Sequence, residues 1–311
     1  MINKKITAFA GGVGGAKLVY GLSKILDTQN FNVIVNTGDD FSYYGLQISP
    51  DIDSIIYSLA EVSDPINGFG RKEDSFNVFH ALGDLGDIPW FRLGDKDLAL
   101  NIKRTQLLKL GMSLSDVTKV LCDALGVQTS VFPMTDDPVY TKIQTCDLGV
   151  MDFQEYFVLN KFQPKVKMIY YSNLESAKIT DQAKSAIEKS DIIIICPSNP
   201  WLSIFPILKL PNLIDMISSK KVVAVSPIIG HNAVKGPTAK LFDEFGEPAS
   251  ALGIAKLYKS IISTLIIDNK NLDEIERIEK LGIKTYVTDI IMSDDKQKIR
   301  LAQEIINLIG D

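Results

Sequence analysis

The sequence holds few of the residues on which thiol and imidazole chemistry depend. Its 311 residues include three cysteines and two histidines. Cys122, Cys146 and Cys196 lie far apart and form no Cys-x-x-Cys pair, which argues against a disulfide framework or a zinc site. We interpret them as buried, reduced thiols. Neither histidine belongs to a Ser-His-Asp order, so the sequence supports acyl and thiol chemistry poorly.

The sequence also lacks an excess of basic residues and a long hydrophobic run. It has 33 basic and 38 acidic residues and a formal net charge of −5, the wrong sign for nonspecific binding to nucleic acid. No stretch approaches the roughly 18 apolar residues of a membrane span. The apolar run after Lys4 and Lys5 is too short for a signal peptide. We therefore predict a cytoplasmic protein without nucleic-acid or membrane partners.

What the sequence does hold is enough apolar residues for a large core. Hydrophobic residues make up 46% and charged residues 23% of the chain, which is typical of packed globular proteins. A chain of this length buries roughly three quarters of its unfolded surface, so it needs no disulfide or metal in order to fold. The length allows one large domain or two ordinary ones.

Strand and helix signals alternate along most of the chain. A strand over 4–10, a glycine-rich loop, a helix over Ala16–Leu26 and a strand over 31–36 form a βαβ opening, which is typical of a parallel sheet. The run Ile192–Ile195 is continuously apolar, as in strands covered on both faces. Further strand signals lie at 166–171, 191–196, 221–226, 264–268 and 284–288, and a last helix at 294–308. We predict a doubly wound α/β fold with a mostly parallel sheet.

Residues 54–126 show helical rather than strand periodicity. Apolar residues recur there at helical spacing, and Ser113 is placed to cap the clearest helix. We predict a small helical insertion subdomain over 54–126 and an α/β domain formed by 1–53 and 127–311. Short strands are also expected in the segment that follows the insertion, at 129–133, 139–145 and 153–158.

Glycine-rich and acidic motifs follow the first two predicted strands, where open α/β sheets bind ligands. Residues 11–17 read Gly-Gly-Val-Gly-Gly-Ala-Lys, which suits an anion at a helix N-terminus or a plain tight turn. Residues 36–40 read Asn-Thr-Gly-Asp-Asp, which suits Mg²⁺ or an Asx turn. Asp51 and Asp53 either cap a helix or serve as metal ligands or a general base.

Four further motifs lie farther along the chain. Arg92 and Lys96 are placed to neutralise phosphate oxygens, although a solvated charged loop has the same composition. Residues 133–138 read as a turn. Residues 196–203 and 226–230 follow two strands, where backbone N–H groups and small polar side chains hold phosphate. Many aspartates and glycine loops with few histidines favour phosphoryl transfer, in which positioning and charge neutralisation carry most of the catalysis.

Seven motifs in register resemble the CofD family, the 2-phospho-L-lactate transferases of deazaflavin coenzyme F420 biosynthesis. They read Asn-Thr-Gly-Asp-Asp, Ile-Ser-Pro-Asp-Ile-Asp, Leu-Gly-Asp-Lys-Asp-Leu, Pro-Met-Thr-Asp-Asp-Pro-Val, Phe-Gln-Glu-Tyr, Pro-Ser-Asn-Pro and Ser-Pro-Ile-Ile-Gly, from residue 36 to residue 230. With the glycine loop, the resemblance extends from residue 11 to residue 237. It implies a Rossmann-like, three-layer α/β fold with a small helical subdomain inserted after the second strand.

The resemblance also implies a reaction. The ribityl hydroxyl of Fo (7,8-didemethyl-8-hydroxy-5-deazariboflavin) attacks the phosphorus that bears the lactyl or enolpyruvyl group of a diphosphoguanosine donor. GMP leaves, and coenzyme F420-0 or its dehydro form results. Mg²⁺ is the implied cofactor, and we expect a homodimer.

The resemblance assigns roles residue by residue. The catalytic residues are Asp51, Asp53 and Lys96, with either aspartate accepting the hydroxyl proton. The metal ligands are Asp40, Asp51 and Asp53. The residues that bind Fo are Asp53, Arg92, Lys96, Thr135 and Asp136. The residues that bind the nucleotide and its phosphates are Gly11, Gly12, Gly14, Gly15, Lys17, Ser198, Asn199, Ser226, Gly230 and Lys235. His231 is a further candidate contact without an assigned role.

Other interpretations stay open. A non-catalytic nucleotide-sugar-binding regulator of the gluconeogenesis-factor group resembles this chain, but such proteins carry a glycine- and serine-rich run where Phe-Ser-Tyr-Tyr stands at 41–44. An NAD-dependent oxidoreductase requires a glycine where Lys17 stands. The Gly-Gly-Val-Gly-Gly loop resembles the bacterial branch of the family rather than the archaeal form, Gly-Gly-Thr-Gly-Thr-Pro-Lys. The three-carbon acid of the donor is therefore open between lactate, enolpyruvate and another acid.

Overall fold

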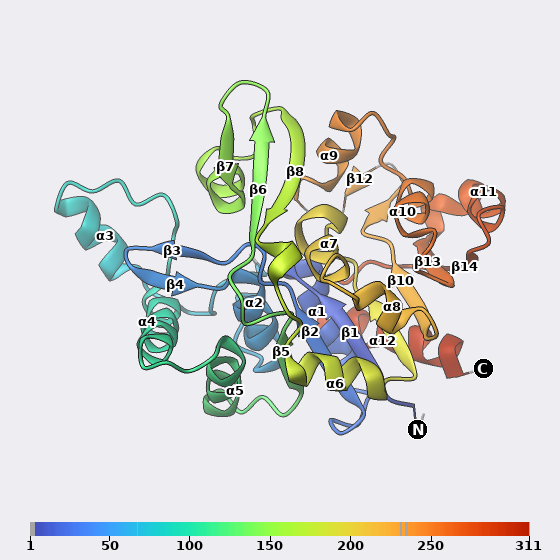
Figure 1. The fold of residues 1–311 in the computed structure, drawn as a ribbon, viewed down its shortest axis with the longest axis horizontal. Coiled ribbons are helices and arrows are strands. Elements are labelled where there is room, and N and C mark those ends of the chain that lie inside the picture. The colour runs from blue at the N-terminus through green and yellow to red at the C-terminus, as the bar shows by residue number, and fades with distance from the viewer. Residues whose placement is uncertain (1–3, 67, 231, 234–235, 311) are drawn as a thin grey trace.

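A seven-stranded parallel sheet forms the centre of the protein (Figure 1). The computed structural model describes residues 4–66, 68–230, 232–233 and 236–310. The strand order is β14-β13-β10-β9-β1-β2-β5. The strands are β1 (Ile6–Ala10), β2 (Phe31–Val35), β5 (Ser130–Pro133), β9 (Ile192–Ile195), β10 (Lys221–Val225), β13 (Thr264–Asp268) and β14 (Lys284–Thr288).

Helices cover both faces of this sheet. One face packs against α1 (Gly12–Ser23), α2 (Pro50–Leu59), α4 (Asp95–Lys109), α5 (Leu114–Ala124) and α12 (Asp295–Gly310). The other face packs against α6 (Asp181–Lys189), α7 (Phe205–Leu208), α8 (Leu213–Ile217), α10 (Ala251–Tyr258) and α11 (Ile275–Glu279). Alternate strand residues point to opposite faces, so Ala8 and Ala10 enter the first core and Phe9 enters the second. The predicted α/β class and its three layers are confirmed.

The strand order reverses beside the central strand β1. From β1 the chain moves outward through β2 and β5, and it then returns to β9 on the other side of β1 before continuing to β14. Ala8 of β1 therefore pairs with Val33 of β2 on one side and Ile194 of β9 on the other. The loops after β1 and β9 leave the sheet in opposite directions at such a reversal, and the crevice between them is where doubly wound sheets bind ligands.

Small antiparallel sheets project from the body. They consist of β3 (Phe41–Tyr43) with β4 (Leu46–Ile48), β6 (Tyr140–Thr145) with β7 (Val150–Asp152) and β8 (Val166–Ser172), and β11 (Ile228–Ile229) with β12 (Asn232–Ala233). The sheet of β6, β7 and β8 rises above the main sheet in Figure 1. The hairpin of β3 and β4 was not predicted from the sequence.

The predicted strand over 153–158 is wrong. Residues Glu155–Leu159 instead form η1, a π-helical turn. Aromatic residues four apart explain the difference, because the rings of Phe153 and Phe157 stack with centroids 5.4 Å apart. That spacing places both rings on one side of a helical turn, whereas in a strand it would place them about 13 Å apart.

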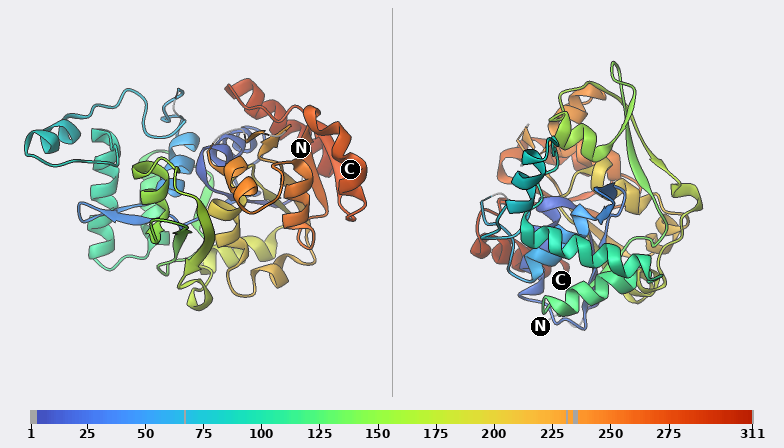
Figure 2. Two further views of the ribbon diagram at one scale, coloured as in Figure 1. Left: turned by 90° about the horizontal axis from the view of Figure 1, so that it is seen from above. Right: turned by 90° about the vertical axis from the view of Figure 1, so that its left-hand side faces the viewer.

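In the residues that the structure describes, the regular elements of the region predicted as an insertion are helices joined by loops, together with one antiparallel bridge between Ser63 and Arg71. The predicted boundary at residue 54 falls inside α2, whose Ile52 and Ile55 belong to the core of the main sheet. Helix α3 (Asn77–Asp84) and the segment before it extend away from the body (Figure 2). Within the described residues we find no helix whose length and apolar content would let it span a bilayer.

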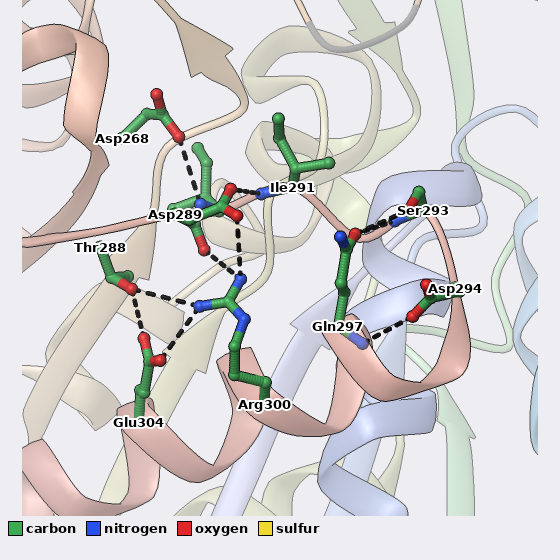
Figure 3. A network of polar contacts seen from close by, with 10 residues as sticks. Asp268, Thr288, Asp289, Ile291, Ser293, Asp294, Gln297, Arg300 and Glu304 are labelled. Atoms are coloured by element: carbon green, nitrogen blue, oxygen red, sulfur yellow. Dashed lines mark hydrogen bonds and ion pairs between the residues drawn. The ribbon is translucent and has the colours of Figure 1, made fainter.

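The remaining short elements are η2 (Leu174–Ser176), η3 (Pro200–Ile204), η4 (Asn269–Glu274) and α9 (Thr238–Glu244). The last helix, α12, is fastened to the loop after β14 by the network drawn in Figure 3. Arg300 donates to the Asp289 carbonyl oxygen at 2.5 Å and to Glu304 at 3.0 Å. This network holds α12 in place over α1.

Close packing of α12 on α1 predicts the effect of one substitution. A Cβ atom at Gly21 of α1 would lie 2.2 Å from the Lys298 carbonyl oxygen of α12. Backbone yields little, so Gly21→Ala should lower the free energy of unfolding by about 1–3 kcal/mol, as measured by urea denaturation. Gly83→Ala in α3 is the matched control, because its Cβ meets nothing within 4 Å. That variant should be unchanged or stabilised by up to about 1 kcal/mol. Equal effects of both variants would contradict the packing argument.

Candidate active site

Helix α1 begins inside the glycine-rich loop that follows β1. The sequence predicted its start at Ala16, but it starts at Gly12, because a side chain of α2 caps it. The Gly12 N–H donates to Asp51 Oδ1 at 2.6 Å, and a carboxylate is favourable at the positive end of a helix. A Cβ atom at Gly11 would lie 2.2 Å from Asp51 Oδ2. Glycine at this position therefore allows Asp51 to approach the loop.

The same loop contacts the loop after β9, across the reversal of strand order. Ser198 Oγ donates to the Gly11 carbonyl oxygen at 2.7 Å. A Cβ atom at Gly14 would lie 2.3 Å from the Pro197 carbonyl oxygen, and one at Gly15 would lie 2.7 Å from Ser198 Oγ. These glycines and Ser198 thus bring the two loops together. Their predicted contacts with a nucleotide, and that of Lys17 on the same helix, stay predictions.

Four aspartates are buried together where β2 ends and α2 begins. Asp39, Asp40, Asp51 and Asp53 are each between 4% and 8% exposed. Asn36, the first residue after β2, donates through Nδ2 to Asp39 Oδ1 at 2.6 Å and to Asp51 Oδ2 at 3.0 Å. We call these four carboxyl groups the acidic cluster. The structure thus brings together Asp40, Asp51 and Asp53, as the sequence predicted, and adds Asp39.

Burial makes ionisation of the acidic cluster costly. It raises the pKa of Asp51 to about 6, against the opposing effect of its hydrogen bond from Asn36. It also raises the pKa of Asp39 and of Asp40 well above the usual range, and neighbouring carboxylates add to the shift at Asp39. Ser49 Oγ donates to Asp40 Oδ2 at 2.7 Å. Asp40 Oδ1 is buried and has no hydrogen-bond partner among the described residues.

A buried arginine that the sequence did not reveal neutralises one of these carboxyl groups. Arg104 of α4 is 0% exposed, and it donates through Nη1 to Asp53 Oδ2 at 3.1 Å and through Nη2 to Asp53 Oδ1. Its Nη1 also donates to Asn101. Burial still raises the pKa of Asp53, and the attraction of Arg104 opposes the shift. In this arrangement both Asp53 oxygens accept from Arg104, so the guanidinium already neutralises the charge of this carboxylate.

Helix α4 supplies a further carboxyl group beside the acidic cluster. Tyr57 donates its hydroxyl hydrogen to Asp97 Oδ1 at 2.5 Å. Burial, with the charge of Asp53 second, raises the pKa of Asp97 to about 7. Asp97, Asn101 and Arg104 are four and three residues apart, which places them on one side of a helix. Polar residues at this helical spacing are the sequence pattern from which Asp97, Asn101 and Arg104 could have been predicted.

Two other elements reach the acidic cluster. Gln154, which precedes η1, donates to Asp39 Oδ2 at 3.4 Å. The Ser203 hydroxyl of η3 lowers the pKa of Asp51, against the effect of burial. A Cβ atom at Gly11 would lie 2.7 Å from the Ser203 Cβ atom. Both residues lie in motifs noted in the sequence, yet neither was assigned a role, because nothing local links them to aspartates so distant in the chain.

Arg92 and Lys96 lie outside the acidic cluster. Both are exposed. Lys96 Nζ donates to the carbonyl oxygens of Glu73 at 2.6 Å and Lys72 at 3.3 Å, and the Arg92 guanidinium lies 3.9 Å from the centre of the Phe76 ring. In the described conformation these cations hold the segment before α3. Their predicted roles toward Fo stay predictions.

Thr135 and Asp136 also make structural contacts. Thr135 is fully buried and donates to the Lys178 carbonyl oxygen at 2.6 Å. Asp136 is exposed, and its Oδ1 accepts from the Ser115 N–H at 2.7 Å, in the first turn of α5. The structure does not bring either residue to the acidic cluster, and the predicted contacts with Fo stay untested.

The remaining predicted nucleotide contacts lie on loops at the carboxyl edge of the sheet. Asn199 caps η3. Ser226 is fully buried in a tight turn after β10. Gly230, at φ +59°, follows β11. Lys235 and His231 lie outside the described residues.

The acidic cluster fits one divalent cation if a substrate completes the coordination. Within the described residues, no group of three or more His, Cys, Asp or Glu side chains is arranged to hold a metal by itself. Mg²⁺ in proteins is typically bound by one or two carboxylates together with substrate phosphates. The buried, unpartnered Asp40 Oδ1 is an acceptor without a donor, as expected of a group that faces a cation. Asp39 and Asp51 are the neighbouring carboxylates.

The ion pair between Arg104 and Asp53 predicts a test by mutation. Arg104→Met leaves Asp53 as a buried carboxyl without its partner, which should lower the free energy of unfolding by about 3–5 kcal/mol. Adding Asp53→Asn removes the stranded charge, so the double variant should regain at least about 1 kcal/mol over Arg104→Met alone. Urea denaturation followed by circular dichroism measures both values. If the double variant instead loses the sum of the unfolding free energies lost by the two single variants, the pairing of Arg104 with Asp53 is contradicted.

The raised pKa of Asp97 predicts a dependence of stability on pH. The folded protein holds this proton up to about pH 7, whereas the unfolded chain releases it near its usual pKa of 3.8. The contribution of Asp97 therefore favours folding at low pH and is lost as the pH rises through 7. Asp97→Asn removes it, so the stability of this variant relative to wild type should rise by about 2 kcal/mol or more from pH 5 to pH 8. Asp123→Asn, at an exposed residue, should show no such trend. If the stability of Asp97→Asn relative to wild type does not change with pH, the raised pKa of Asp97 is refuted.

Comparisons with known proteins agree with the predicted family. Residues 6–305 match the family model described as 2-phospho-L-lactate transferase CofD. The chain is 40% identical to the 2-phospho-L-lactate transferase of Methanocaldococcus jannaschii over 308 residues, which cover 98% of both proteins. It is 35% identical to that of Methanosarcina mazei over 298 residues, which cover 96% of this chain and 98% of the relative.

The solved structures support the fold. A UPF0052-family protein from Bacillus halodurans aligns with a TM-score of 0.69 at 18% identity, over 98% of this chain and all of that one. At this identity the likeness concerns the fold alone. The family match and the full-length relatives confirm the predicted enzyme class over the regulator and the oxidoreductase. The chain belongs to the CofD family of 2-phospho-L-lactate transferases.

Proposed function

We propose that the protein transfers the phospholactyl group of lactyl-2-diphospho-5′-guanosine to the ribityl hydroxyl of Fo. A bond forms between the hydroxyl oxygen and the phosphorus that bears lactate, and the bond from that phosphorus to GMP breaks. The products are coenzyme F420-0 and GMP. The full-length identity with relatives named for phospholactate supports lactate over enolpyruvate as the three-carbon acid.

The observation that most directly supports the proposal is the position of the acidic cluster beside the glycine loop. Asp51 caps α1 at Gly12, and the loop after β9 packs against the same turn. The start of α1 favours a diphosphate, but an ionised acidic cluster would repel it. A diphosphate and buried carboxylates share one place when a cation lies between them, and this arrangement is typical of phosphoryl transfer.

Mg²⁺ is the cation that we propose, bound through Asp40 with Asp39 and Asp51 beside it. When bound, it neutralises charge on the diphosphate oxygens. Asp53 is left out of this set because its ion pair with Arg104 already neutralises its charge. In our proposal Asp53 and Arg104 act through their neighbours, by fixing the start of α2.

Asp51 is the residue that we propose accepts the proton of the ribityl hydroxyl. Its pKa of about 6 leaves it ionised at neutral pH and close enough to neutrality to take a proton in the transition state. It also lies against the glycine loop, where the diphosphate is proposed to bind. The bound donor would place the reacting phosphorus near it.

The nucleotide part of the donor is assigned to the loops after β1, β9 and β10, which lie at the carboxyl edge of the sheet. The Fo contacts proposed for Arg92, Lys96, Thr135 and Asp136 require these residues to be approached from the side of the helical insertion. The expected homodimer stays a prediction.

A direct assay tests this function. The protein is incubated with Fo, Mg²⁺ and either lactyl-2-diphospho-5′-guanosine or its enolpyruvyl counterpart, and the products are measured by mass spectrometry. We expect F420-0 and GMP in equal amounts with the lactyl donor, and loss of both on addition of EDTA. No product with either donor, or product formation that survives EDTA, would contradict the proposal or its metal.

Matched aspartate variants test the assigned roles in the same assay. Asp51→Asn should lower kcat by about 10²-fold or more, because the amide cannot accept the proton. Asp40→Asn should raise the Mg²⁺ concentration needed for half-maximal rate. Asp123→Asn, exposed on α5, should leave both values unchanged. A near-normal kcat for Asp51→Asn would remove this residue from proton transfer.

A further inference from the structure

One buried side chain holds the loop after β10 through paired hydrogen bonds. Asn271 is 1% exposed. The Gly230 N–H donates to Asn271 Oδ1 at 2.9 Å, and Asn271 Nδ2 donates to the Gly230 carbonyl oxygen at 2.9 Å. The side-chain amide thus pairs with both backbone groups of one residue, as a neighbouring strand would. The two residues are 41 positions apart in sequence.

The position of Gly230 explains why such pairing is needed. Gly230 follows β11 at the turn toward β12, with Ile229 paired to Asn232, and its φ of +59° is the left-handed conformation that favours glycine. A turn formed by two-residue strands has little hydrogen bonding of its own. Asn271 lies in η4, which follows β13, the next strand of the main sheet. The amide therefore connects the carboxyl-end loops of two adjacent strands.

The amide is itself held in one orientation. Asn271 Nδ2 also donates to Glu274 Oε1 at 3.0 Å, and Glu274, 4% exposed, accepts the Leu252 N–H at 2.5 Å at the start of α10. An ionised carboxylate and a backbone carbonyl only accept hydrogen bonds, so the nitrogen of the amide must face both. A buried chain of hydrogen bonds thus runs from α10 to the Gly230 turn.

We infer that Asn271 is a positioning residue for the donor nucleotide, which acts by fixing the Gly230 turn without touching substrate. This inference rests on the proposed function, in which the loop after β10 binds the guanosine side of the donor. It concerns a residue of η4 that no motif marks and that lies outside the acidic cluster. Because Fo is assigned to the other side of the site, the effect should fall on one substrate.

The test is the steady-state kinetics of Asn271→Asp with lactyl-2-diphospho-5′-guanosine and Fo varied in turn. The introduced carboxylate keeps the acceptor for the Gly230 N–H but cannot donate to the Gly230 carbonyl oxygen or to Glu274. We expect the KM for the donor to rise at least 10-fold, while the KM for Fo and kcat at saturating donor stay within about twofold of wild type. If this variant does not fold, Asn271→Ala replaces it with the same expectation.

A matched control separates positioning from general weakening of this region. Ser250→Ala removes the cap of α10, where Ser250 Oγ accepts the Gly253 N–H at 3.0 Å, and leaves the Gly230 turn intact. It should lower Tm without changing the KM for the donor. An unchanged donor KM in the Asn271 variant, or parallel rises for donor and Fo, would overturn the inference. Absence of product from wild type would instead refute the proposed function, and the inference with it.

Discussion

Burial of several carboxyl groups in one place is the constraint on which the rest of this structure depends. An ionised carboxylate removed from water costs several kcal/mol unless donors or cations surround it, and the acidic cluster meets that requirement only in part. Asn36, the Gly12 N–H and Ser49 supply neutral donors, and Arg104 supplies one full charge. One oxygen of Asp40 is left without a partner in the described residues. In the proposed function, this imbalance is what a cation bound between the carboxylates and the diphosphate would offset.

This constraint also gives the glycine-rich loop a packing role that its sequence did not suggest. In the sequence it suggests a surface that a ligand approaches closely, yet in the structure a Cβ at Gly11 or Gly14 would meet atoms of the protein itself. The small residues allow α2 and the loop after β9 to close against the first turn of α1. Preorganisation of this kind costs nothing at the moment of reaction, since the dipoles and carboxylates would already be in place before the proposed donor binds.

Sequence reasoning predicted the parts of the fold that local pattern determines. Runs such as Ile192–Ile195 are apolar at every position because both faces of the strand are covered, and such runs mark a central parallel strand without further information. The turn at Glu155–Leu159 was misjudged because alternation and aromatic content outweighed a four-residue spacing. Arg104 and Asn271 were missed for another reason. Each pairs with a residue more than 40 positions away, and although the helical spacing of polar residues on α4 marks Arg104 as a candidate, nothing in the sequence identifies the distant partner of either residue.

The helical insertion therefore supplies side chains that the buried carboxyl groups of the main domain need. Its helix α4 places Arg104 against Asp53 and Asp97 against Tyr57, so α2 would carry an unpaired buried carboxyl if α4 moved away. Gln154 reaches the same cluster from the segment between β7 and η1. The acidic cluster is thus enclosed by elements that the chain reaches at widely separated points. Because each of them meets part of the same electrostatic requirement, the insertion and the body should fold and bind substrate as one cooperative unit rather than as two domains joined by a hinge.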